Sequence, residues 1–187
     1  MTNSNSTPLV QGRFVDPAIV STHFHIREGD TVADFGAGSG YFMDTLAQKV
    51  GTQGILYLCE IQKELSVKLG DMARSKGLAQ VRPVWCDVED HEGSKIPDGE
   101  LDVAILVNTF FQFENKETAL KEIMRTLRSG GKLFVVDWSE SFNGLGPQPG
   151  HVVSEIQTKE MAEQVGFIYE HSFDAGDHHY AVALRKV

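Results

Sequence analysis

The chain has 187 residues, of which 41% are hydrophobic and 23% are charged, the balance of an ordinary globular protein. Its formal net charge of −9 opposes binding to a phosphate backbone, so we do not expect a nucleic-acid partner. Two cysteines, Cys59 and Cys86, are too few for a disulfide framework, which favours a reducing, cytoplasmic location. The apolar runs are too short for a membrane span.

Composition also suggests how the chain is organised. Residues 1–12 are polar and lack the basic and apolar regions of a secretory signal, so we expect a flexible tail there. Residues 13–187 are expected to form a single domain. Residues 139–150 contain three glycines and two prolines, and we interpret them as a loop within that domain.

Apolar, β-branched segments alternate with segments of helical periodicity along the chain. The predicted helices are 17–24, 41–50, 62–76, 116–127 and 158–165, and the glycines at 130–131 should end the fourth. The predicted strands are 31–36, 54–60, 81–88, 101–108, 132–139, 167–175 and 178–186. Regular alternation of this kind predicts a parallel sheet with helices on both faces. A short link at 176–177 predicts a closing hairpin, and therefore one antiparallel strand.

The strongest local feature is a glycine-rich turn between the first strand and the next helix. Glycines at 36, 38 and 40 allow a tight turn and a close approach of a ligand to the backbone. A dinucleotide site would have the spacing G-x-G-x-x-G, but Tyr41 stands where its third glycine would fall. Asp34 would lie awkwardly close to a pyrophosphate, whereas a carboxylate there suits a cationic amino-acid group.

Acidic residues also end the next two strands. Glu60 follows the second strand and could accept both hydroxyls of a ribose. Asp87 follows the third strand, where it could accept a hydrogen bond from an adenine amino group beside Val88. Any one of these acids could be a solvated loop residue or a helix cap. Three of them in register with the glycines favour a ligand site.

The ordered segments VADFGAGSGYF, LYLCE, CDVED, LDVAILVNTFFQF and GGKLFVVDW resemble the motifs of class I S-adenosylmethionine-dependent methyltransferases. Within that class, they are similar to the small-molecule branch that includes ubiquinone/menaquinone-biosynthesis and arsenite methyltransferases. The resemblance covers roughly residues 14–187. It implies an α/β, doubly wound, Rossmann-like seven-stranded sheet of order 3-2-1-4-5-7-6, with the last strand antiparallel and helices on both faces.

The resemblance implies S-adenosyl-L-methionine as the cofactor and S-adenosyl-L-homocysteine as its product. By the same resemblance, one group of residues would cradle the methionine part: Asp34, Gly36, Ala37, Gly38 and Gly40. The residues implied for the rest of the cofactor are Glu60 at the ribose, Ile61 packed on adenine, Asp87 and Val88 at the adenine edge, and Asn108 beneath the methyl donor.

The methyl acceptor is expected to be a small molecule, methylated by in-line displacement. The fourth strand lacks the (Asn/Asp)-Pro-Pro-(Tyr/Phe) signature that follows it in enzymes that methylate nucleic-acid amino groups. No Asp-Asn pair follows the fifth strand, so we predict no metal. The candidate acceptor-pocket residues are Phe14, His23, Phe110, Phe111, Trp138 and His151, although the phenylalanines could equally belong to the core.

A catalytic base is not identified by the sequence, which offers only His151, Asp137 and Asn108 as candidates. Two alternatives remain open: a non-catalytic S-adenosylmethionine-binding sensor or partner subunit, and an NAD(P)-dependent oxidoreductase, which Tyr41 disfavours. Little chain is left over to shape the acceptor pocket. We therefore expect a pocket that is either open or completed by a second subunit, as in a homodimer.

Overall fold

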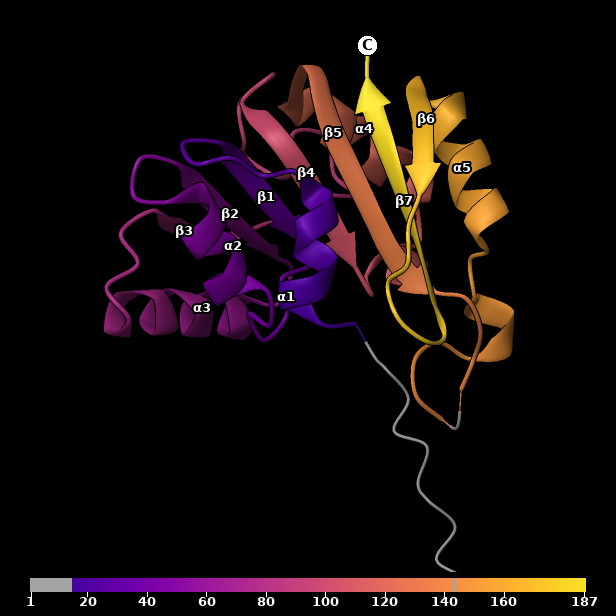
Figure 1. The fold of residues 1–187 in the computed structure, drawn as a ribbon, viewed down its shortest axis with the longest axis horizontal. Coiled ribbons are helices and arrows are strands. Elements are labelled where there is room, and N and C mark those ends of the chain that lie inside the picture. Colours follow the sequence, from indigo (N-terminus) through magenta and orange to yellow (C-terminus); the bar gives the residue numbers. More distant parts are fainter. Residues whose placement is uncertain (1–14, 143) are drawn as a thin grey trace, which may run out of the picture.

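The computed structural model describes residues 15–142 and 144–187 as one seven-stranded sheet with helices on both faces (Figure 1). The strands are β1 (Thr31–Phe35), β2 (Ile55–Glu60), β3 (Val81–Trp85), β4 (Leu101–Val107), β5 (Leu127–Trp138), β6 (Phe167–Ser172) and β7 (His179–Lys186). Their spatial order is β3-β2-β1-β4-β5-β7-β6, as predicted. Only β7 runs antiparallel to its neighbours, β5 and β6.

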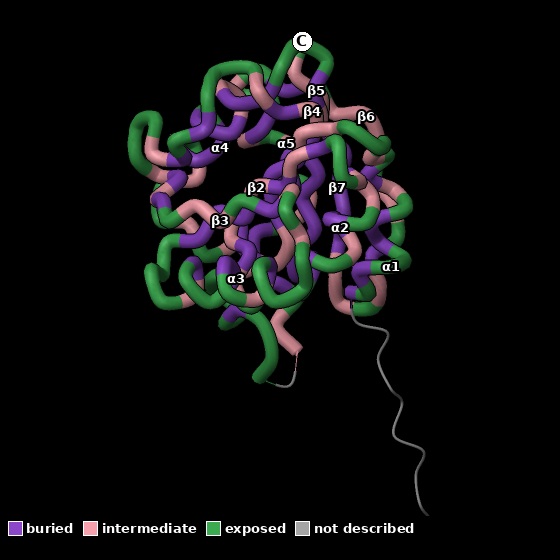
Figure 2. Tube along the Cα trace, turned by 90° about the vertical axis from the view of Figure 1, so that its left-hand side faces the viewer, coloured by how far each residue is buried: buried purple, intermediate pink, exposed green. Residues whose placement is uncertain are grey.

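Two layers of helices enclose the sheet. One face carries α1 (Pro17–Val20), the 3-10 turn η1 (Ser21–Phe24), α2 (Met43–Val50) and α3 (Lys63–Ser75). The other face carries α4 (Lys116–Thr126) and α5 (Glu155–Gln164). Two further 3-10 turns, η2 (Phe110–Gln112) and η3 (Pro149–His151), follow β4 and β5. Each face of the sheet has its own apolar core. Figure 2 shows the buried residues gathered in the interior of the molecule.

The predicted role of the glycines at 130–131 and the predicted start of the last helix were wrong. The α4 helix ends at Thr126, and the fully buried Leu127 already pairs with Leu101 of β4, so the glycines at 130–131 lie within β5. The α5 helix begins at Glu155, because Ser154 and Gln157 form a capping box in front of the predicted start.

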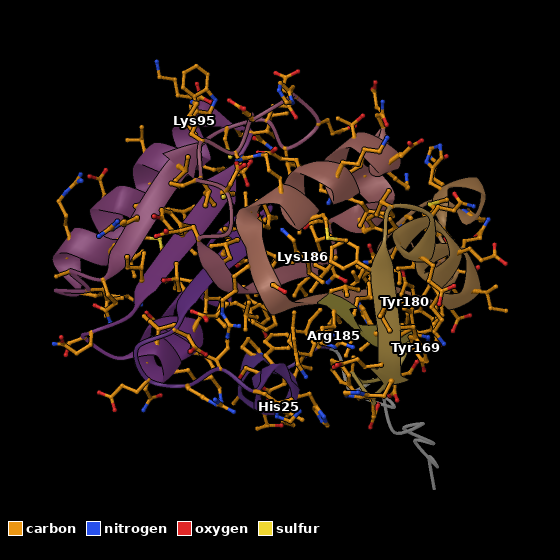
Figure 3. The ribbon with its side chains drawn as sticks, turned by 90° about the horizontal axis from the view of Figure 1, so that it is seen from above. His25, Lys95, Tyr169, Tyr180, Arg185 and Lys186 are labelled. Carbon is orange, nitrogen blue, oxygen red and sulfur yellow. The ribbon has the colours of Figure 1, made fainter. Side chains whose placement is uncertain are left out.

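The connection between β6 and β7 is longer than the predicted two-residue turn. β6 ends at Ser172, although the Phe173 N–H still donates to the Ala181 carbonyl at 3.1 Å. The Phe173 ring packs on the α1 face, where it meets the rings of Phe24 and Phe134. At the far end of β7, Lys186 (labelled in Figure 3) donates hydrogen bonds to the main-chain carbonyls of Met124 in α4 and Leu127 at the start of β5. In the part of the chain described, no helix has the length and apolar character needed to cross a bilayer.

Candidate functional site

The glycine-rich loop after β1 adopts a backbone that other residues rarely allow. The φ angles of Gly36, Gly38 and Gly40 are +85°, +54° and +81°. A side chain at Gly36 would collide with Thr109, and one at Gly40 would come within 2.7 Å of Leu69 on α3. The first glycine therefore allows β1 and β4 to approach each other, and the third allows the loop to pack on α3.

Glu60 ties the glycine loop to the end of β2. Its Oε2 accepts the main-chain N–H of Gly38 at 2.9 Å, and its Oε1 accepts that of Gln62 at 2.8 Å. The residue is only 6% exposed. Each oxygen keeps a further lone pair, so the fixed carboxylate can still accept hydrogen bonds from a ligand.

A hollow of about 260 Å³ opens at the carboxyl ends of β1, β2, β3 and β4, and we call it the strand-end hollow. Its lining contains glycines, carboxylates, two free thiols and apolar side chains: Phe35, Gly36, Gly38, Cys59, Glu60, Ile61, Gln62, Leu65, Cys86, Asp87, Val88, Glu89, Thr109, Gln112 and Phe113. Six of the ten predicted cofactor residues line this one hollow: Gly36, Gly38, Glu60, Ile61, Asp87 and Val88. The other four, Asp34, Ala37, Gly40 and Asn108, are near lining residues in the sequence but do not line the hollow.

Ile61, Asp87 and Val88 line the hollow after the ends of β2 and β3. Ile61 is 58% exposed, which leaves its side chain free to cover a flat apolar ligand. Asp87 accepts the N–H of Glu89 through Oδ1 at 2.9 Å, which fixes the turn after β3. Val88 lines the hollow next to it.

Asp34 is a buried carboxyl beneath the glycine loop. Burial, and secondarily the charge of Glu60, raise its pKa to about 7. A cation placed beside this carboxyl would favour its ionised form. Asp34 is therefore only partly ionised near pH 7 in the free protein, and a bound ammonium group would increase its ionised fraction.

Asn108 follows β4 in a left-handed conformation, with φ +55°. Its N–H donates to the Val136 carbonyl at 2.9 Å, and its own carbonyl accepts from Gln112 Nε2 at 2.8 Å. Its side-chain Oδ1 is buried and has no hydrogen-bond partner within the described ranges. Strain and an unsatisfied polar atom at one position are features that concentrate at functional sites.

The predicted acceptor-pocket residues do not all come together. Phe110 is fully buried in the core on the α4 face, so its assignment to a pocket was wrong. Phe111 and His151 both line a second hollow, which adjoins the strand-end hollow at Gln112 and Phe113.

The other candidates lie elsewhere. His23 stacks on Phe173 with ring centroids 4.5 Å apart, and Trp138 stands at the end of β5 on that same face of the sheet. Phe14 lies outside the described residues.

Asp137 caps a turn and does not face the strand-end hollow. It is 1% exposed, and it accepts the N–H groups of Phe111 at 3.0 Å and Trp138 at 2.8 Å. Burial raises its pKa to about 6, although these main-chain donors oppose the shift. Its carboxylate holds η2 in place, which argues against the predicted role as a base.

Sequence reasoning missed Thr109, whose side chain contacts Gly36, and His179, whose ring lies against Trp138 with centroids 4.3 Å apart. Alternation along β7 opposite Trp138 could have placed His179 beside that ring.

The family model described as "Methyltransferase domain" matches residues 33–135. A ubiquinone/menaquinone biosynthesis C-methyltransferase from Chromobacterium violaceum is 31% identical over 122 residues, 65% of this chain and 48% of that protein. The chain thus spans about half the length of the curated relatives it matches.

Solved structures show the same fold. A SAM-dependent methyltransferase from Aquifex aeolicus is 25% identical, with a TM-score of 0.85 over 93% of this chain and 91% of that one. The [4+2]-cyclase SpnF is 16% identical, with a TM-score of 0.78 over 91% of this chain and 79% of that one, a likeness of fold alone.

Proposed function

This chain belongs to the methyltransferase domain family of class I S-adenosylmethionine-dependent methyltransferases, and from that membership we propose that it transfers a methyl group to a small-molecule acceptor. The observation that carries the proposal is the Glu60 carboxylate, fixed by two N–H groups at the border of the glycine loop. A carboxylate held in this way is preorganised to accept both hydroxyls of a ribose.

Side chains in and beside the strand-end hollow suit S-adenosylmethionine in three places. Glu60 would hold the ribose, and Asp87 the adenine amino group between Ile61 and Val88. Asp34 would attract the ammonium group of the methionine part, which Gly36 and Gly38 allow to approach the backbone. When bound, the cofactor supplies a methyl carbon activated by its attachment to a sulfonium.

The contribution of the protein to such a transfer is mostly positional. An activated methyl group needs a nucleophile held in line with the bond that breaks, and correct placement alone can lower the barrier by several kcal/mol, about 7–11 at most. Rigid supports for that placement are present near the site, because Asp137 fixes η2 and the Asn108 backbone is bonded on both sides. A small acceptor is favoured by the net charge of −9, which opposes nucleic acid.

Calorimetric titration with S-adenosylmethionine and S-adenosylhomocysteine tests the cofactor, with NADH and NADPH as controls. Glu60→Ala should weaken both sulfur ligands about 10- to 100-fold, because hydrogen bonds to a charged group contribute about 1.5–3 kcal/mol. Glu64→Ala, an exposed glutamate on α3, is the matched control and should bind like the wild type.

Each outcome has a distinct meaning. Failure of the folded wild-type protein to bind either sulfur ligand would refute the proposal, and saturable NADH binding would point to an oxidoreductase. Cofactor binding without S-adenosylhomocysteine formation across a broad acceptor panel would favour the non-catalytic sensor or partner subunit.

A further inference from the structure

Two free thiols line the strand-end hollow, and the proposed cofactor contacts use neither of them. Cys59 lies near the end of β2, and Cys86 directly follows β3, the neighbouring strand. Cys59 pairs with Val84, so Cys86 is two positions further along on the same face of the sheet. Both cysteines belong to the apolar core on the α4 face. Because the two thiols are also hydrogen-bonded to each other, they form one site.

The main chain of Cys59 is held more firmly than that of Cys86. The Cys59 carbonyl accepts the N–H groups of Gly36 at 2.9 Å and Ala37 at 3.0 Å, which join it to the glycine loop. β3 lies at the edge of the sheet, so Cys86 has a neighbouring strand on one side only. A movement that brings the two sulfur atoms together should therefore displace Cys86 and the adjacent Asp87 more than Cys59.

The surroundings of Cys86 favour its thiolate over that of Cys59. The hydrogen bond from the Cys59 thiol lowers the pKa of Cys86 despite its burial, and the charge of Lys95 lowers it further. Lys95 (labelled in Figure 3) is held beside Cys86 by a hydrogen bond of 2.6 Å from Nζ to the Trp85 carbonyl. The same thiol contact, together with burial, raises the pKa of Cys59 well above its usual value. Cys86 is therefore the nucleophile of the pair, and Cys59 is the thiol that reacts second.

The lining of the hollow indicates which kind of oxidant can reach the pair. The volume of about 260 Å³ limits the oxidant to a small molecule. Glu60, Asp87 and Glu89 line the same hollow as the thiols, and their carboxylates attract a cation. A small cationic disulfide compound therefore has the size and the charge that suit this site.

We propose that Cys59 and Cys86 form a redox-active thiol pair, which a small disulfide compound converts to an intramolecular disulfide that weakens cofactor binding. Cys86 Sγ first attacks one sulfur of the compound, and the other sulfur leaves with the electron pair of the broken bond. Cys59 Sγ then attacks Cys86 Sγ and releases the second half of the compound as a thiol. The two protein thiols lose two electrons and two protons in total, and the two released thiols carry them away.

The oxidised pair should alter the adenine end of the hollow, a consequence that rests on the proposed function. A disulfide holds its two Cα atoms within about 7 Å of each other, whereas diagonal neighbours on adjacent strands are about 7–8 Å apart. Bond formation therefore draws Cys86 towards Cys59 and moves Asp87 away from the adenine amino group. Loss of a hydrogen bond to a charged group should weaken cofactor binding about 10-fold or more. By linkage, the bound cofactor should protect the thiols from oxidation.

The test uses the full-length protein, whose two cysteines are the only ones in the chain. Reduced protein is treated with cystamine, with and without saturating S-adenosylhomocysteine, and is analysed by intact mass and peptide mapping. We expect a loss of two hydrogens and a bond between Cys59 and Cys86, formed about 10-fold or more slowly when the ligand is present. In calorimetry, the oxidised protein should bind S-adenosylhomocysteine about 10-fold or more weakly, and dithiothreitol should restore the affinity.

Single variants distinguish the roles of the two thiols. Cys59→Ser should stop at a mixed disulfide on Cys86, because the second thiol is missing, whereas Cys86→Ser should react with cystamine about 10-fold or more slowly. Lys95→Gln should slow the first step about 2- to 3-fold, since it removes a partly exposed charge beside the thiolate. Lys63→Gln is the matched control and should react at the wild-type rate, because Lys63 also lies over the Trp85 ring, 5.0 Å from its centroid against 5.4 Å for Lys95.

The outcomes separate the thiol pair from the proposed function. Far-ultraviolet circular dichroism of the oxidised protein should match that of the reduced protein, which would exclude unfolding as the cause of weaker binding. If cystamine produces no intramolecular disulfide, or if the oxidised protein binds S-adenosylhomocysteine as tightly as the reduced protein, the redox-active pair is refuted. Failure of the reduced protein to bind S-adenosylhomocysteine would instead remove the proposed function, and the mass measurement would still show whether the two thiols react.

Discussion

Glu60 at the end of β2 accepts the N–H of Gly38, in the loop after β1, at 2.9 Å. The two halves of the strand-end hollow are therefore bonded to each other before any ligand arrives. A substitution in the glycine loop should consequently alter the position of the Glu60 carboxylate, and a substitution of Glu60 should alter the position of the loop.

Gly36→Ala should be the most damaging small substitution in the loop. The added methyl group would meet Thr109, and φ +85° is strained for alanine. Gly77→Ala provides the control, because Gly77 also has a positive φ but its Cβ would meet nothing within 4 Å. We expect Gly36→Ala to lower the free energy of unfolding by about 1–3 kcal/mol more than Gly77→Ala, measured by urea denaturation. Equal losses in the two variants would show that the contact with Thr109 is unimportant.

Affinity for S-adenosylmethionine should rise with pH because of Asp34. Its pKa is about 7 in the free protein, and a bound ammonium group should lower it. Binding below pH 7 should therefore release up to about one proton, and the affinity should increase between pH 6 and pH 8. Calorimetry in buffers of different ionisation enthalpy measures this release. Asp34→Asn should abolish it, and a wild-type protein that releases no proton at pH 6 would contradict the assignment.

Stability should depend on pH through Asp137. Its pKa in the folded protein, about 6, is above that of an unfolded aspartate, so the folded state binds this proton more tightly. The stabilisation is complete below the unfolded pKa and is lost as pH rises through about 6. Asp34 adds a loss of the same sign up to about pH 7. Thermal unfolding of Asp137→Asn should show a flatter decline between pH 4.5 and 6.5 than the wild type.

A buried ion pair should stabilise the segment that follows Asp87. Glu122 on α4 accepts from Arg125 at 2.7 Å and from the N–H of Ser94 at 3.1 Å. Burial raises the pKa of Glu122, but these hydrogen bonds outweigh it and hold the pKa below its usual value. Glu122→Ala should cost about 1.5–3 kcal/mol in chemical denaturation, since Arg125 and Ser94 lose a charged hydrogen-bond acceptor while Arg125 keeps Asp98. Glu117→Ala, in the exposed pair with Lys121, should cost less than about 1 kcal/mol.

Structural features that depend on local residue types could be predicted from the sequence. Positive φ angles require the glycines of the loop, and apolar periodicity places β1 and β4, so both could be predicted. Contacts between residues far apart in the sequence could not be predicted in this way. Phe110 and Phe111 are adjacent and chemically identical, yet one is core and the other lines a hollow, because η2 turns between them. The tautomer of His179 likewise depends on where the Asp177 carbonyl lies, which no local pattern specifies.

The loop after β5 packs on Trp138 through a single glycine. Gly146 has φ +70°, and a Cβ there would come within 2.6 Å of Trp138 Cε2, so Gly146→Ala must displace the indole or the loop. Gly144→Ala is a matched control, since φ is +74° and nothing lies within 4 Å. Because the Trp138 ring is packed between this loop and His179, we expect Gly146→Ala to change Trp138 fluorescence and to lower the free energy of unfolding more than Gly144→Ala does. S-adenosylhomocysteine affinity should be the same in both variants, because the loop does not line the strand-end hollow. A fall in that affinity in Gly146→Ala alone would mean that the loop contributes to the cofactor site as well.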